Sequence, residues 1–119
     1  INKDSEIIIL NFGALMEMSK NVAEKLDCSL ADMRFVKPLD AEFLKKIHDK
    51  KLIVTIEDGS RYGGAGSAVQ EWFADNNLNV IIRSFGIPDE FIEHASRDEM
   101  IKMASLNGDA IIDQIKKLI

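Results

Sequence analysis

The segment Leu52-Ile53-Val54-Thr55-Ile56 is an almost wholly apolar run, and a glycine-rich stretch, Gly63-Gly64-Ala65-Gly66, follows it after a short polar loop. A short β-branched run of this kind is typical of a strand that is buried on both faces of a sheet. Beyond the glycines, apolar residues recur at steps of three and four, which predicts an amphipathic helix. The positions of its apolar face are Ala65, Ala68, Val69, Trp72 and Phe73. Strand, loop and helix in this order predict one unit of an α/β fold.

The alternation of strand and helix continues on both sides of this unit. Further strands are predicted from Ile7 to Leu10, from Met33 to near Val36, and from Val80 to Ile82. The remaining helices are predicted from their apolar positions and caps: Leu15, Met18, Val22 and Leu26; Phe43, Leu44 and Ile47 behind an Asp40 N-cap; Met100, Met103 and Ala104 behind a Ser96–Glu99 capping box; and Ile111, Ile112, Ile115, Leu118 and Ile119. Strands that alternate with helices pair in parallel, so residues 1–119 are predicted to form one three-layer α/β/α sandwich.

Composition limits the possible function classes. The chain has 119 residues, of which 46% are hydrophobic and 29% charged, as expected for one soluble globular domain. Its formal net charge of −5 and mixed charge pattern argue against a nucleic-acid partner, which needs a basic face. No apolar run approaches the ~18 residues of a membrane span. The single cysteine, Cys28, permits no internal disulfide, so we expect a cytoplasmic protein in which this thiol is packed and unreactive.

The glycine-rich stretch is the candidate site with the clearest physical rationale. Backbone N–H groups at a helix N-terminus can hold an anion, which makes Gly63, Gly64 and Gly66, together with Arg61, candidate anion-binding residues. The competing interpretation is that the glycines let the helix pack closely on the sheet. The sequence favours close packing, because neither a G-x-G-x-x-G pattern nor a P-loop lysine is present.

No other group of residues predicts catalytic, cofactor-binding or metal-binding chemistry. Asp58-Gly59 followed by Asn76-Asn77 is superficially similar to the Gly-Asp-Gly…Asn-Asn motif of thiamine-diphosphate enzymes, but its spacing is too short and Glu57 replaces the first glycine. Glu57 is better interpreted as a local structural acid. His48 and His94 lack a partner nucleophile and metal-ligand spacing, so both are interpreted as surface or capping residues.

Three ordered segments carry a family resemblance. They are Met33-Arg34-Phe35-Val36-Lys37-Pro38-Leu39-Asp40; Val54-Thr55-Ile56-Glu57-Asp58 with Gly63-Gly64-Ala65-Gly66-Ser67-Ala68-Val69; and Phe85-Gly86-Ile87-Pro88-Asp89-Glu90-Phe91-Ile92-Glu93-His94. Together they resemble the C-terminal domain of the 1-deoxy-D-xylulose-5-phosphate synthases, over essentially the whole chain. The glycine-rich segment is shared more widely, with transketolases and the β subunits of 2-oxoacid dehydrogenases. Ala95 is a departure, because this family usually has glycine there.

The resemblance implies a structural role within a larger enzyme. The parent would condense pyruvate with glyceraldehyde 3-phosphate, using thiamine diphosphate and magnesium held by domains upstream of this chain. No catalytic or cofactor-binding residue is therefore carried over. The resemblance also implies contacts with those upstream domains, a homodimer in the full-length protein, and one antiparallel edge strand. The alternatives are the C-terminal domain of another transketolase or of a 2-oxoacid dehydrogenase β subunit, and an autonomous α/β module that binds a phosphorylated ligand.

Overall fold

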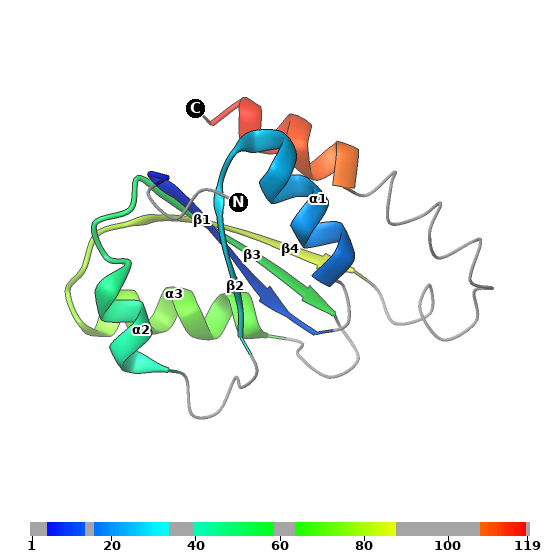
Figure 1. The fold of residues 1–119 in the computed structure, drawn as a ribbon. Coiled ribbons are helices and arrows are strands. Elements are labelled where there is room, and N and C mark those ends of the chain that lie inside the picture. The colour runs from blue at the N-terminus through cyan, green and yellow to red at the C-terminus, as the bar shows by residue number, and fades with distance from the viewer. Residues whose placement is uncertain (1–4, 14–15, 34–39, 59–63, 88–107, 119) are drawn as a thin grey trace.

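A computed structural model describes residues 5–13, 16–33, 40–58, 64–87 and 108–118 (Figure 1). Within them the chain forms a four-stranded sheet. In spatial order its strands are β2 (Ser29–Asp32), β1 (Ile7–Phe12), β3 (Leu52–Asp58) and β4 (Ile81–Ile87). All three strand pairs are parallel, and the antiparallel edge strand that the resemblance implies is not among these four.

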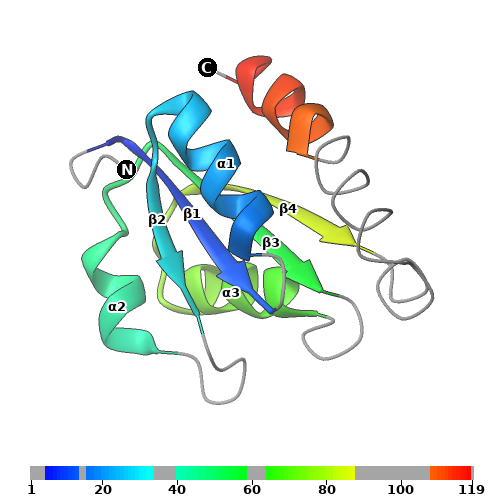
Figure 2. The ribbon, with the colours of Figure 1, turned by 45° about the vertical axis from the view of Figure 1, so that its right-hand side comes forward.

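Helices cover both faces of the sheet. Helix α1 (Met16–Leu26) and the helical residues 108–116 lie on one face, while α2 (Ala41–Lys46) and α3 (Ala65–Asp75) lie on the other (Figures 1 and 2). The three-layer α/β/α sandwich predicted from the sequence is therefore confirmed. The predicted N-cap of α2 is also present, since the Asp40 carboxylate accepts a hydrogen bond from the Phe43 N–H at 3.1 Å.

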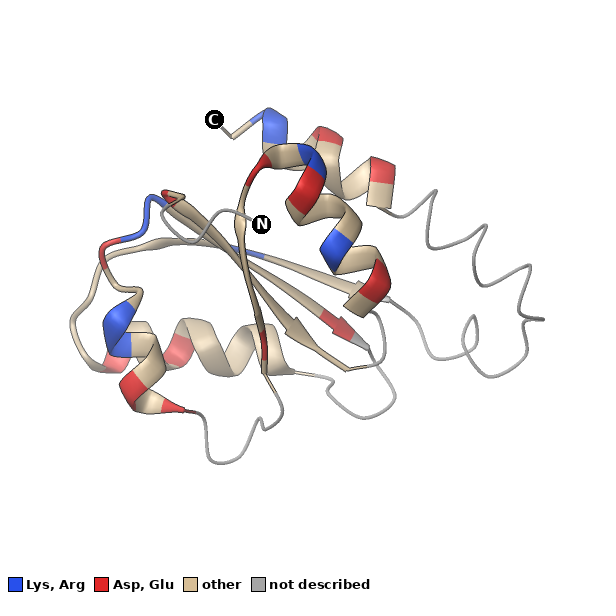
Figure 3. Cartoon of the chain, in the orientation of Figure 1, with Lys and Arg blue, Asp and Glu red and all other residues tan. Residues whose placement is uncertain are grey.

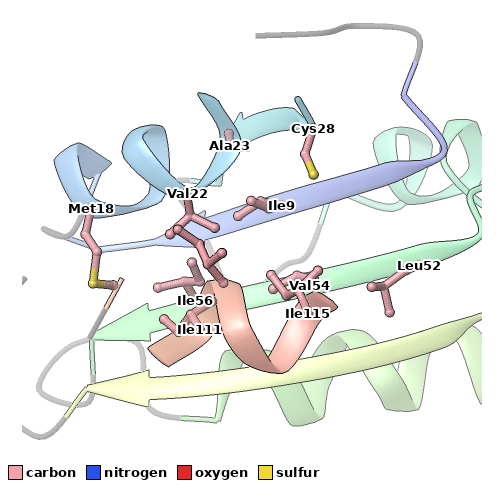
Figure 4. Packing of buried hydrophobic residues seen from close by; sticks show 11 residues of the cluster. Ile9, Met18, Val22, Ala23, Cys28, Leu52, Val54, Ile56, Ile111 and Ile115 are labelled. Atoms are coloured by element: carbon pink, nitrogen blue, oxygen red, sulfur yellow. The ribbon is translucent and has the colours of Figure 1, made fainter. Parts of the chain in front are cut away.

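Alternate residues of the central strands supply two separate cores. Side chains from β1, β3, α1 and residues 108–116 form the first core (Figure 4), and those from β1, β3, α2 and α3 form the second. The buried members of the first are Ile9, Met18, Val22, Ala23, Cys28, Leu52, Val54, Ile56, Ile111, Ile112 and Ile115. Those of the second are Ile8, Leu10, Phe12, Met33, Leu44, Ile47, Ile53, Ala65, Val69 and Phe73. Because both faces of β1 and β3 are covered, these strands are apolar in continuous runs.

The second strand was predicted too late in the chain. It spans Ser29–Asp32, whereas the sequence predicted it from Met33 to near Val36, and residues 34–36 lie outside the described part. The cause is the tight end of α1: Asp27 adopts a positive φ of 54°, and the Cys28 N–H donates to the Ala23 carbonyl. This geometry turns the chain at once, so the strand begins directly after the helix.

Most of the other predicted elements agree with the structure where it describes them, but Leu118, predicted as an apolar position of the last helix, follows the helical residues 108–116 and is exposed. Strand β4 starts one residue later than predicted and continues to Ile87. Helix α3 ends at Asp75, with Asn76 as its C-cap, as the sequence indicated. The predicted capping box at Ser96 and Glu99 lies outside the described residues, as does the helix that it would open.

Two aromatic residues of α3 differ in burial although they are adjacent. Phe73 is fully buried in the second core, whereas Trp72 is only partly buried and packs against its edge. The two rings meet edge to face, with centroids 5.0 Å apart. The sequence placed both on the inward face of the helix, but Phe73 is the residue that fills the core.

We therefore expect Phe73→Ala to lower the free energy of unfolding by about 3–5 kcal/mol, because it leaves a cavity in a closed core. Trp72→Ala should cost less, about 1–2 kcal/mol, because part of that side chain already faces solvent. Urea denaturation followed by circular dichroism measures both changes, with the exposed Leu118→Ala as a surface control. A larger loss from Trp72→Ala than from Phe73→Ala would contradict this assignment.

Candidate functional site

The carboxyl ends of the strands form the edge of the sheet where α/β proteins usually bind ligands. From β1 the chain first crosses to β2, on one side of β1, and then crosses to β3, on its other side. The point at which the strand order reverses therefore lies between β1 and β3. The polar side chains described at this edge are those of Asn11 on β1, Asp32 on β2 and Glu57 on β3. Their hydrogen bonds decide whether the edge is open to a ligand.

Asn11 is completely buried, and both ends of its amide are hydrogen-bonded. Its Oδ1 accepts from the Ser19 hydroxyl at 2.8 Å. Its Nδ2 donates to the Gly13 carbonyl at 3.1 Å and to the Asp32 carboxylate at 3.2 Å. These bonds use both N–H groups of the amide and join β1, β2 and α1. Asn11 therefore fixes the ends of two strands instead of presenting a free group to a ligand.

Glu57 caps the N-terminus of α3. Its Oε2 accepts a hydrogen bond from the Gly66 N–H at 2.8 Å. Gly64, the N-cap residue, has a φ of 88° and supplies no side-chain hydrogen bond of its own. A carboxylate is stabilising at this position, because the N-terminal end of a helix carries partial positive charge. The interpretation of Glu57 as a local structural acid is thus confirmed.

The backbone of Gly66 approaches the sheet too closely for a side chain. A Cβ atom built on Gly66 would lie 2.3 Å from the Ser84 Oγ and 2.8 Å from the Thr55 Oγ1. These two hydroxyls are hydrogen-bonded to each other at 2.8 Å. Close packing of α3 on β3 and β4 therefore requires glycine at this position.

The structure describes two of the four candidate anion-binding residues, Gly64 and Gly66. Gly64 is the N-cap of α3, and the Gly66 N–H is already bonded to Glu57. Gly63 and Arg61 lie outside the described residues. An anion at Gly66 would have to compete with a carboxylate of the protein for that donor.

The apparent thiamine-diphosphate motif does not assemble into a site. Asp58 ends β3, whereas Asn76 lies at the far end of α3, a helix of 11 residues that spans about 16 Å. The Asn76 amide instead donates to the Trp72 carbonyl at 2.8 Å. Among the described residues, no group of three or more histidine, cysteine, aspartate or glutamate side chains could hold a metal ion. The described residues of the apparent motif thus do not come together to hold a magnesium diphosphate.

The remaining candidates agree with a structural interpretation where they are described. Cys28 is fully buried in the first core, and its pKa is raised by burial and, secondarily, by the Asp27 carboxylate. Its thiol is therefore protonated at neutral pH and is a poor nucleophile. His48 is exposed, as predicted, and His94 lies outside the described residues.

Comparison with known proteins places the chain in a family. Residues 1–111 match the transketolase C-terminal domain family. The chain belongs to this family. The 1-deoxy-D-xylulose-5-phosphate synthase of Francisella philomiragia subsp. philomiragia is 38% identical over 122 residues, covering 100% of the chain and 20% of that protein. The synthase of Francisella tularensis subsp. novicida is 40% identical, with the same coverage. The resemblance inferred from the three sequence segments is confirmed.

This chain corresponds to only a part of each of these synthases. The chain spans about a fifth of the length of the synthases that it matches. None of the described helices is long and apolar enough to cross a membrane. Blue segments (Lys, Arg) and red segments (Asp, Glu) occur together on α1, on α2 and on the helical residues 108–116 (Figure 3).

The close approach at Gly66 predicts that Gly66→Ala destabilises the domain by about 1–3 kcal/mol, because the new methyl group overpacks the contact with Ser84 and Thr55. Gly64→Ala meets no neighbouring atom and should cost only the strain of its positive φ, about 1–2 kcal/mol. Thermal and urea unfolding measure both.

The second-site variant Ser84→Gly separates the steric crowding at Gly66 from the backbone strain at Gly64. It should partly rescue Gly66→Ala, because it removes two of the three atoms that crowd the methyl group, and it should not rescue Gly64→Ala. Normal stability of Gly66→Ala combined with weaker binding of a phosphorylated metabolite would instead favour an anion site at this loop.

Proposed function

We propose that this chain is the C-terminal domain of a 1-deoxy-D-xylulose-5-phosphate synthase and that its role there is structural. The observation that carries the proposal is the 38–40% identity to synthases over the whole chain, combined with coverage of only 20% of those proteins. The parent enzyme would condense pyruvate with glyceraldehyde 3-phosphate, release carbon dioxide and form 1-deoxy-D-xylulose 5-phosphate.

Thiamine diphosphate and magnesium would supply the carbanion chemistry of that reaction from domains upstream of this chain. The arrangement of Asp58 and Asn76, at opposite ends of α3, supports this division of labour. The hydrogen bonds that occupy Asn11 and Glu57 support it further, because they use the polar groups that a ligand would need. In the proposal, this domain supports its upstream neighbours and contributes to a cytoplasmic homodimer.

The autonomous binding module is the competing function. It would use the glycine-rich loop to hold a phosphorylated ligand. The bond from the Gly66 N–H to Glu57 argues against it, because a phosphate at that amide would face a carboxylate.

A domain exchange tests the proposed function. Replacing the matching C-terminal fifth of the Francisella philomiragia synthase with this chain should give an active enzyme, because the matched region covers the whole chain. The same synthase without its C-terminal fifth is the control and should lose most of its activity. A chimera that unfolds cooperatively, yet makes no 1-deoxy-D-xylulose 5-phosphate, would count against the proposal.

The isolated chain should neither bind thiamine diphosphate tightly nor consume pyruvate. The physical reason is that magnesium-diphosphate binding needs oxygen ligands that converge on one point, and the Asp58 and Asn76 positions lie at opposite ends of α3. Calorimetric titration with thiamine diphosphate and magnesium, followed by a pyruvate-consumption assay, measures both properties. Micromolar binding with turnover from a folded sample would overturn the structural role.

A further inference from the structure

A groove with a volume of about 500 Å³ lies between strand β2 and helix α2, at the edge of the sheet opposite β4 (Figure 2). Sites that bind small molecules usually have volumes of about 300–1,000 Å³. The β2–α2 groove is distinct from the carboxyl edge of the sheet, because none of Asn11, Asp32 and Glu57 is among its described lining residues. Those lining residues are Ile8, Ser29, Leu30, Ala31, Phe43, Lys46, Ile47 and Lys50.

Most of the groove's described lining is apolar and belongs to the packed structure. Ile8 and Ile47 are buried members of the second core, so they form a fixed floor. Ala31 and Phe43 are partly buried and pack against the same core, while Leu30 packs against the first. A ligand that covers these side chains removes apolar surface from water, which favours binding.

The charged side chains among these lining residues are two lysines and no carboxylate. The Lys46 ammonium is exposed and forms no hydrogen bond or ion pair with a described residue, Glu42 one helical turn earlier included. The Lys50 ammonium donates to the Ser5 carbonyl. An ammonium has three N–H groups, so this bond leaves donors for a second acceptor. The groove therefore offers positive charge beside an apolar floor, in a chain whose net charge is −5.

The two lysines are held on the same side of the groove. Phe43, Lys46, Ile47 and Lys50 are spaced by three, one and three residues, which places them on one face of a helix. α2 itself ends at Lys46, but the turn after it continues the same path, since the Lys50 N–H donates to the Ile47 carbonyl at 3.1 Å. An anion can thus meet both ammonium groups while an attached chain lies on the apolar floor.

We propose that the β2–α2 groove binds a small amphipathic anion, an apolar chain that ends in a carboxylate. The chain would cover Ile8, Ala31 and Ile47, and the carboxylate would lie between Lys46 and Lys50. A neutral molecule of the same shape would gain only the apolar contacts, so charge provides the specificity. This site does not depend on the proposed function.

Octanoate is the probe that tests the proposal, with octanol as the matched neutral control and acetate as the head group alone. Octanoate should bind at least about fivefold more tightly than octanol, because one exposed ion pair contributes up to about that factor. Raised salt should weaken the binding of octanoate but not of octanol. Amide chemical shifts measured during the titration should change at Ala31 and Ile47. Equal affinity for octanoate and octanol, or shift changes confined to other residues, would overturn the proposal.

Replacement of single lysines tests the place of the carboxylate. Lys46→Gln and Lys50→Gln should each lower the octanoate affinity about three- to fivefold, the effect of one exposed ion pair. Lys45→Gln is the matched control, because Lys45 is exposed on the same helix and is not among the described lining residues. It should leave the affinity unchanged. A loss through Lys45→Gln as large as that through Lys46→Gln would contradict a localised site.

Filling the groove tests the place of the apolar chain. Ala31→Leu adds three carbons to a half-buried lining residue and should lower the octanoate affinity at least about fivefold, since each buried CH₂ contributes about 0.8 kcal/mol. Urea unfolding of the variant shows whether its fold is intact. Unchanged octanoate affinity in a cooperatively folded Ala31→Leu chain would overturn the proposal, and the lysine variants test it independently of this substitution.

Two other occupants of the groove would be detected by the same titration. A second copy of the chain would make the apparent octanoate affinity fall as the protein concentration rises. An upstream domain of a parent enzyme would block octanoate binding in the chimeric synthase but not in the isolated chain. Either result would overturn the proposal, whereas equal affinity at all protein concentrations and in the chimera is the result expected.

Discussion

Burial of both faces of β1 and β3 is the constraint on which the rest of this structure depends. A strand without a solvent-facing side must place apolar side chains in both directions, and its backbone groups must all be paired within the sheet. Ile8 and Ile9 meet this requirement by entering different cores. Two helical layers then become necessary, because each face of the sheet needs a cover. The three-layer order follows from these two strands.

The same constraint explains which elements could be predicted from the sequence. β1 and β3 were predictable because double burial leaves an apolar run. β2 was not, because an edge strand with the sequence Ser29-Leu30-Ala31-Asp32 contains no such run, and its start is set by the backbone turn at Asp27. Helical periodicity placed Trp72 and Phe73 on one face, but adjacent residues differ by about 100° around a helix. Only the packed structure shows that Phe73 fills the core.

Like the fold, the candidate site could be predicted only in part from the sequence. A glycine between a strand and a helix indicates either a ligand or a close approach, and the nearness of Ser84 to Gly66 shows the close approach. The network around Asn11 gave no sequence signal, because its partners Ser19 and Asp32 are 8 and 21 residues away. Both are ordinary polar residues in the sequence. Their common role appears only when β1, β2 and α1 meet.

The carboxyl edge of this sheet shows why fold alone does not assign a function. In an open α/β sheet this edge offers converging strand ends and a helix N-terminus, which are favourable places for an anion. Here the protein supplies its own groups: Glu57 bonds the first turn of α3, and Asn11 bonds across two strands. A buried polar group that is fully paired within the protein loses those bonds if a ligand takes its partner. The described part of this edge is thus better suited to holding a fixed shape than to exchanging ligands, which is the property that a supporting domain of a larger enzyme requires.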